Sequence, residues 1–205
     1  MISGLSLPSG TSITTRVPLI VRLSPGEEAI MITMTADMSK AEQIEASELS
    51  DTITSYTREL TTTKLSVSDT PIYLTCVAPG NPIMTLIDLP GITHMSSDEE
   101  VGKDIHEQTV NLTMKYIKNE QIIILCVIPG VDDFANAEAL KLAKIVDPLG
   151  KRTLGVITKA DLCTPSSDII AKLQGQHIPL KLGFIAVKKD ETRQAERAWF
   201  KASPV

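Results

Sequence analysis

The chain has 205 residues, of which 42% are hydrophobic and 22% are charged, and its formal net charge is −5. This composition is typical of a globular protein and does not fit a disordered, collagen-like or membrane-spanning chain. The negative charge and the 3% aromatic content argue against a nucleic-acid-binding surface, which needs basic or stacking side chains. At this length we expect a single domain over residues 1–205.

The three cysteines, Cys76, Cys126 and Cys163, lie far apart and include no Cys-x-x-Cys pair. The sequence therefore indicates neither a disulfide framework nor a zinc site, and isolated thiols fit the reducing cytoplasm. The opening residues lack a basic-then-apolar start, and no apolar run reaches the roughly 18 residues of a membrane span. We expect a cytoplasmic protein with no export signal.

The first part of the chain is rich in β-forming residues. Strands are predicted at residues 18–23, 29–34, 72–77 and 84–87. A turn signal, Ser24-Pro25-Gly26, separates the first two strands, so we expect them to form a hairpin-like pair. Ser39 and Glu42 have the spacing of a capping box, and helical periodicity follows, which predicts a helix from about Ser39 to about Leu60.

From residue 84 onward, predicted strands and helices alternate. Helices are expected at residues 98–118, 136–146 and 166–173, an amphipathic segment at 191–200, and strands at 121–128, 153–157 and 183–187. This alternation predicts an α/β fold with a mostly parallel sheet flanked by helices. Ligands of such sheets bind beyond the carboxyl ends of the strands, where Asp88 and Thr158 are expected.

The phrase Thr158-Lys159-Ala160-Asp161 follows one of these strands and suits the recognition of guanine. A carboxylate there can accept hydrogen bonds from both N1–H and the exocyclic amine of guanine. Adenine offers no such pair of donors, so it would leave the charge of Asp161 unpaired. The aliphatic part of Lys159 can lie over the purine ring. The alternative is a lysine and an aspartate that occupy a surface turn by coincidence.

The phrase Asp88-Leu89-Pro90-Gly91 follows another strand and suits a triphosphate with Mg²⁺. Magnesium keeps several waters and accepts a nearby carboxylate, the role predicted for Asp88. Gly91 can bring a bare backbone N–H against the γ-phosphate, where a side chain would obstruct. The alternative is a proline and glycine turn that merely ends the strand.

Longer segments around both phrases resemble a known family. The segment Leu86-Ile87-Asp88-Leu89-Pro90-Gly91-Ile92-Thr93 looks like the metal and γ-phosphate segment of the dynamin superfamily of large GTPases, which includes the Mx proteins. Residues 138–144, 146–150 and 152–162 are similar to the helix, turn and base-reading strand that follow in that family. Near the start, Thr15-Arg16-Val17-Pro18-Leu19 looks like its first switch.

The resemblance implies a P-loop GTPase-like fold, the dynamin-type G domain, and a role for individual residues. Thr15 would contact Mg²⁺ and order the attacking water. The catalytic residues implied are Thr15, Gly91, Thr93 and His94; the nucleotide-binding residues are Thr158, Lys159, Asp161 and Lys189; the metal ligands are Asp88 and Thr15. Asp133 and Asn136 match a loop used when two G domains meet, although Asn136 could instead cap the next helix.

The sequence departs from the family pattern at four places. No Gly-x-x-x-x-Gly-Lys-Ser/Thr phosphate loop occurs between Met1 and Val205, so we expect an N-terminally truncated G domain. His94 stands where the family has Lys or Arg, and Ser12 stands where its first switch has Gly. The late base-supporting loop reads Lys188-Lys189-Asp190.

The resemblance predicts binding of GTP with Mg²⁺ and hydrolysis by attack of water on the γ-phosphate, in the service of membrane remodelling or intracellular defence. It further implies self-association through the G domain, and association with membranes or microtubules through stalk regions that this sequence lacks. The expected location is the cytoplasm, including the surface of organelle membranes, and no nucleic-acid partner is expected. The alternative is an inactive truncated G domain that acts as a protein-interaction module.

Overall fold

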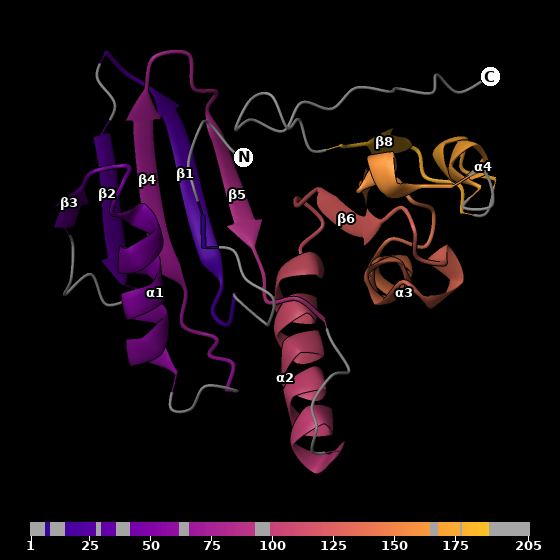
Figure 1. Cartoon of the computed structure of the whole chain (residues 1–205), viewed down its shortest axis with the longest axis horizontal. Coiled ribbons are helices and arrows are strands. Elements are labelled where there is room, and N and C mark those ends of the chain that lie inside the picture. Colours follow the sequence, from indigo (N-terminus) through magenta and orange to yellow (C-terminus); the bar gives the residue numbers. More distant parts are fainter. Residues whose placement is uncertain are drawn as a thin grey trace. The chain divides into compact units, whose positions relative to one another are not determined.

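The structure is a computed structural model of the chain that describes residues 7–8, 15–27, 30–35, 42–61, 66–92, 99–164, 168–176 and 178–188. It divides into two compact units, residues 1–113 and residues 114–205, each with its own sheet (Figure 1). The expected α/β fold is confirmed. None of the helices in the described ranges has the length and apolar character needed to cross a membrane.

The first unit is built on a five-stranded sheet of order β3-β2-β4-β1-β5. Its elements are β1 (Leu19–Pro25), β2 (Ile30–Thr35), β3 (Glu42–Ile44), α1 (Leu49–Leu60), β4 (Ile72–Ala78) and β5 (Met84–Asp88). Among the strands of the described residues, β1 and β4 pair in parallel, whereas the pairs β1–β5, β2–β4 and β2–β3 are antiparallel. The sheet of this unit is therefore mixed.

Two local predictions for this unit are wrong. The first two strands form no hairpin, because β4 lies between β1 and β2 and pairs with both. The turn signal ends β1, but it does not choose the partner strand. Residues Glu42–Ile44 form β3 rather than helix, because they pair with β2, and α1 begins only at Leu49. Long-range pairing overrides the capping-box pattern there.

The core of the first unit lies between the sheet and α1. The apolar side chains of β1 and β4 alternate between buried and half-buried positions, as expected for a strand with one face on the core. Figure 1 shows α1 in front of the sheet, where it packs on β4. The buried residues are Val17, Leu19, Val21, Leu23, Leu49, Ile53, Tyr56, Ile72, Leu74 and Cys76.

The second unit has a three-stranded sheet of order β6-β7-β8 in which all pairs are parallel. Its elements, with the helix α2 that leads into it from the first unit, are α2 (Glu99–Ile117), β6 (Ile124–Pro129), α3 (Glu138–Val146), β7 (Thr153–Thr158), α4 (Ile169–Leu173) and β8 (Phe184–Ala186). These elements confirm the predicted alternation. The predicted amphipathic segment at 191–200 lies outside the described residues.

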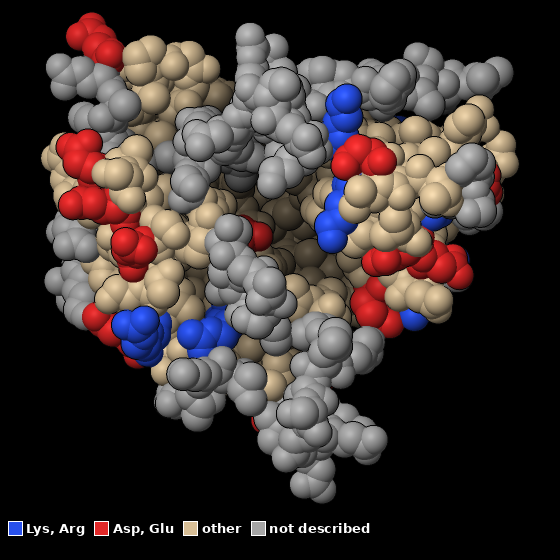
Figure 2. Space-filling view, viewed as in Figure 1, with Lys and Arg blue, Asp and Glu red and all other residues tan. Residues whose placement is uncertain are grey.

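Parallel pairing brings the carboxyl ends of the three strands to one edge of this sheet. The residues that follow them are Gly130 after β6, Lys159 after β7 and Val187 after β8. Helix α3 packs on β6 and α4 packs on β8. On the face viewed in Figure 2, acidic and basic side chains are interspersed in both units.

Candidate nucleotide site

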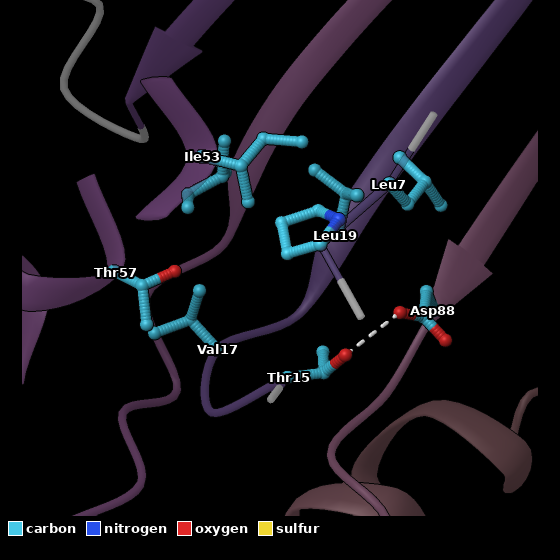
Figure 3. A pocket seen from close by; sticks show the side chains of 9 residues that line it. Leu7, Thr15, Val17, Leu19, Ile53, Thr57 and Asp88 are labelled. Carbon is cyan, nitrogen blue, oxygen red and sulfur yellow. Dashed lines mark hydrogen bonds between the residues drawn. The ribbon is translucent and has the colours of Figure 1, made fainter. Parts of the chain in front are cut away.

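The predicted metal residues of the first unit lie together. Thr15 Oγ1 donates a hydrogen bond of 3.1 Å to Asp88 Oδ2, although 73 positions separate the two residues (Figure 3). The antiparallel register of β1 and β5 explains the meeting, because it pairs Leu19 with Asp88 and so brings the segment before β1 to the carboxyl end of β5. A hydroxyl and a carboxylate oxygen thus face each other at one end of the sheet.

Beside this pair lies a small cavity of about 30 Å³. Figure 3 shows Thr15 and Asp88 at one side of it, with apolar side chains from β1 and α1 opposite. The other lining residues are Leu7, Pro8, Val17, Leu19, Ile53, Thr57 and Ile72. A cavity of this size admits a water molecule or two rather than a nucleotide.

The surroundings of the Asp88 carboxyl are compatible with a bound cation. Desolvation by the surrounding protein raises the pKa of its carboxyl, and the hydrogen bond from Thr15 partly opposes that rise. The side chain is nonetheless exposed to solvent at the end of β5, so it is accessible. A nearby positive charge would favour the ionised form of such a carboxylate.

The donor set also fits magnesium. Within the described ranges, no group of three or more His, Cys, Asp or Glu side chains is placed to hold a metal ion. Magnesium does not need one, because it is commonly bound by one or two protein oxygens together with phosphate oxygens and water. Thr15 and Asp88 supply two hard oxygen donors of this kind.

The predicted guanine-reading residues form a tight turn in the second unit. After β7 ends at Thr158, Lys159 adopts a left-handed conformation with φ 53° and ψ 37°, and a 3₁₀ turn follows over Ala160–Leu162. The N–H of Ala160 donates to Val187 O at 3.2 Å and so fastens this turn to the segment after β8. The left-handed conformation is unfavourable in free energy for any residue other than glycine. It persists where the surrounding structure imposes it.

The side chains of this turn are available to a ligand. Lys159 and Asp161 are both exposed, while Thr158 is half-buried and its Oγ1 lies 3.5 Å from Ile128 O. The aspartate therefore projects from a backbone that the strand and the 3₁₀ turn hold in place. This arrangement can present a carboxylate to a pair of N–H donors.

Of the remaining predicted residues, Gly91 is described and three are not. Gly91 is exposed, and a Cβ built on it would meet nothing within 4 Å, so the protein itself does not require glycine there. Thr93, His94 and Lys189 lie outside the described residues, as does Ser12. The suggestion that Asn136 caps α3 is wrong, because Ala137 occupies the cap position and no side chain caps the helix.

Two residues near the guanine-reading turn escaped the sequence analysis. The N–H of Gly130 donates to Thr158 O at 2.7 Å, and a Cβ on Gly130 would lie 2.6 Å from Cys163 Sγ. Lys172, on α4, is buried and donates to Gly130 O at 3.0 Å. A glycine directly after an apolar strand was a usable signal for Gly130, but a lysine on a short helix gives no sign of burial.

Comparisons with known proteins show the family of the chain. A model of the dynamin family matches residues 1–160 of the chain. Dynamin-A of Dictyostelium discoideum is 38% identical over 217 residues, which cover 97% of this chain and 25% of that protein. Dynamin-2 of Bos taurus is 37% identical over 210 residues, which cover 97% of this chain and 24% of that protein.

Two further comparisons bear on length and fold. The putative dynamin-related protein 4A of Arabidopsis thaliana is 31% identical over 211 residues, which cover 100% of this chain and 69% of that protein. A solved structure of an oligomerised bacterial dynamin pair has the same fold, with a TM-score of 0.51 and 16% identity over 86% of this chain and 26% of that one. The chain thus spans about a quarter of the length of Dynamin-A and Dynamin-2.

Proposed function

This chain belongs to the dynamin family, and we propose that it binds GTP with Mg²⁺ and hydrolyses it. The observation that carries the proposal is the hydrogen bond between Thr15 and Asp88 at the carboxyl end of β5. Two oxygen donors from distant parts of the sequence meet where the resemblance expects the metal and the γ-phosphate. In this proposal the two units together form one G domain over residues 1–205.

Asp161 carries the preference for guanine. Its carboxylate is exposed at the end of a turn that is fastened to the segment after β8. The carboxylate accepts two hydrogen bonds from guanine, whereas adenine would leave it facing an acceptor nitrogen. Lys159 covers one face of the purine with its aliphatic stem.

Thr15 and Asp88 hold the metal end of the nucleotide. Bound Mg²⁺ would neutralise charge on the β- and γ-phosphates, as in other phosphoryl-transfer sites. Thr15 orients the attacking water with its hydroxyl, Asp88 provides the nearby carboxylate, and the N–H of Gly91 faces the γ-phosphate. Thr93 and His94, which follow Gly91 in the sequence, support the water and the loop during turnover. Phosphoryl transfer needs such placement more than it needs covalent chemistry.

The wider role follows from the family. We propose self-association through the loop that carries Asp133 and Asn136, membrane remodelling or intracellular defence as the purpose, and a cytoplasmic location that includes organelle membranes. Contacts with membranes or microtubules would come from parts of the protein other than these 205 residues. Lys189 completes the base site in this proposal.

The test uses the protein expressed from its complete transcript. Asp161→Ala should weaken GTP binding by roughly 100-fold, because about 3 kcal/mol is lost with two charge-assisted hydrogen bonds. The midpoint of thermal unfolding without nucleotide should stay the same, since Asp161 is exposed. Glu120→Ala, which removes the same charge from an exposed turn of the same unit, is the control. A preference for ATP, or an equal loss of stability and binding in Asp161→Ala, would refute the assignment.

One observation favours a second function, an interaction module without turnover. The 205 residues contain no Gly-x-x-x-x-Gly-Lys-Ser/Thr loop to cradle the phosphates. The transcript upstream of Met1 decides between the two functions. An in-frame phosphate loop supports GTP hydrolysis, whereas a stop codon directly before Met1 supports the interaction module.

A further inference from the structure

Lys172 is a buried lysine with an unusual set of contacts. Only 8% of the residue is exposed, and its ammonium donates hydrogen bonds to Gly130 O at 3.0 Å and to Asp132 O at 2.8 Å. The same ammonium lies over the ring of Phe134, 5.0 Å from its centroid. All three partners belong to the segment that directly follows β6.

These contacts explain how the charge is tolerated. An ammonium removed from water is costly unless protein groups replace its hydration. Two carbonyl oxygens take two of its three N–H donors, and the negative face of an aromatic ring lies beside the cation. Within the described part of the chain, Lys172 forms no ion pair, so backbone carbonyls rather than a carboxylate hold it.

The segment that Lys172 holds is tied to the guanine-reading turn. Gly130 accepts from Lys172 with its carbonyl and donates to Thr158 O with its N–H, at 2.7 Å. Phe134 stacks on Phe184 of β8, with ring centroids 5.5 Å apart. The segment is therefore fastened to the carboxyl end of β7 at its beginning and to the first residue of β8 near its end.

The segment continues into residues with a proposed role. In the sequence, Asp133 lies between Asp132 and Phe134, which both contact Lys172. Asn136 is the last residue of the 3₁₀ turn over Phe134–Asn136. Both Asp133 and Asn136 are exposed, so their side chains can reach another molecule. Their direction depends on the backbone of residues 130–136.

We propose that Lys172 is a positioning residue that sets the conformation of residues 130–136 and thereby the surface used in self-association. The assignment of that surface rests on the proposed function. Lys172 touches neither nucleotide nor partner; it acts through the backbone carbonyls of Gly130 and Asp132 and through the ring of Phe134.

Hydrogen exchange without nucleotide tests the positioning role. Lys172→Met keeps the length of the side chain and removes the cation, and it should speed exchange at the amides of Asp132 and Asn136 about tenfold. The Asp132 amide donates to Pro129 O at the end of β6, and the Asn136 amide donates to Asp133 O within the segment. The Gly155 amide, which donates to Gly183 O in the sheet, should exchange at the wild-type rate.

The control is Lys144→Met, the same change at an exposed position on α3, which should alter none of these rates. Unchanged exchange over residues 130–136 in Lys172→Met, or faster exchange to the same degree throughout the unit, would overturn the proposal. If Lys172→Met does not fold, Lys172→Arg carries the test, because arginine retains the cation and its donors. Exchange within twofold of wild type in Lys172→Arg supports the role, and tenfold faster exchange contradicts it.

Turnover gives the second readout, with the protein expressed from its complete transcript. Lys172→Met should reduce the stimulation of GTP hydrolysis by rising protein concentration at least fivefold and leave the KM for GTP within twofold. If the stimulation falls and the KM for GTP rises by the same factor, Lys172 only supports the fold, which contradicts the proposal. If the wild-type protein hydrolyses no GTP, the proposed function fails, and the exchange measurement alone decides the role of Lys172.

Discussion

The buried carboxylate of Asp147, at the end of α3, offers a sharp test of how the second unit is stabilised. The residue is 8% exposed, and its side chain accepts three hydrogen bonds. The donors are the N–H of Lys151 at 2.9 Å, the N–H of Arg152 at 2.9 Å and Thr153 Oγ1 at 2.7 Å. One carboxylate thus closes the turn between α3 and β7.

The change Asp147→Asn keeps the shape of the side chain and leaves a single acceptor oxygen. With that oxygen toward Arg152 and Thr153, the new amide group faces the N–H of Lys151, and that hydrogen bond is lost. The two remaining bonds lose their charge assistance. At about 1.5–3 kcal/mol for a bond to a charged group and roughly half of that for a neutral one, the lost bond and the two weakened bonds together should cost roughly 3–6 kcal/mol.

The effect depends on pH, with a definite sign. Desolvation raises the pKa of Asp147, but hydrogen bonds from Thr153, Arg152 and Lys151 and the charge of Arg152 outweigh it, so the folded pKa lies below the ordinary value of 3.8. A lowered folded pKa stabilises the protein above the unfolded pKa, and that stability is lost as the pH falls through the folded pKa. The difference in free energy of unfolding between wild type and Asp147→Asn should therefore be largest near neutral pH and decrease in acid.

Urea unfolding followed by far-ultraviolet circular dichroism measures this difference. With a slope of about 2 kcal/mol per molar urea, the midpoint of Asp147→Asn should lie roughly 1.5–3 M below that of wild type near pH 7. The gap should narrow below about pH 4. Equal midpoints near neutral pH, or a gap that stays constant into acid, would refute the reasoning.

Two further predictions concern packing in the second unit and thiol reactivity. Gly155→Ala should destabilise the protein by about 1–3 kcal/mol, because the added Cβ meets the buried ring of Phe184. Gly91→Ala, where a Cβ meets nothing within 4 Å, is the matched control, and a wild-type melting midpoint for Gly155→Ala would contradict the packing argument. Burial raises the pKa of the Cys126 thiol to about 12, so iodoacetamide at mildly alkaline pH should modify half-buried Cys163 well before it. Mass spectrometry over time checks this order, and equal labelling rates would speak against it.

The elements of the second unit could be predicted because their signals are local. The apolar runs at β6 and β7 and the i, i+3, i+4 spacing in α3 report burial on one or both faces without reference to any distant residue. The position of Asp161 in a turn after β7 followed in the same way. Strand and helix types were therefore correct there.

The pairing of the first unit could not be predicted in this way. A run such as Leu19–Pro25 shows that it is a strand, but its neighbours depend on which other strands complete the sheet. The structure places β1 between β4 and β5 and sets β3 where a helix was expected. The free energy that decides this comes from contacts across long loops, which periodicity along the chain does not encode.

The sequence by itself determined the chemistry that the chain can offer: a carboxylate after one strand, a lysine and a carboxylate after another, and the resemblance that links them to guanine nucleotides. Only the tertiary structure decided which groups meet. It brought Thr15 within 3.1 Å of Asp88 across 73 positions, and it buried Lys172 beneath the segment after β6. Strand register and side-chain packing make those contacts, because hydrogen bonds between strands and the exclusion of water act between residues that the chain keeps far apart.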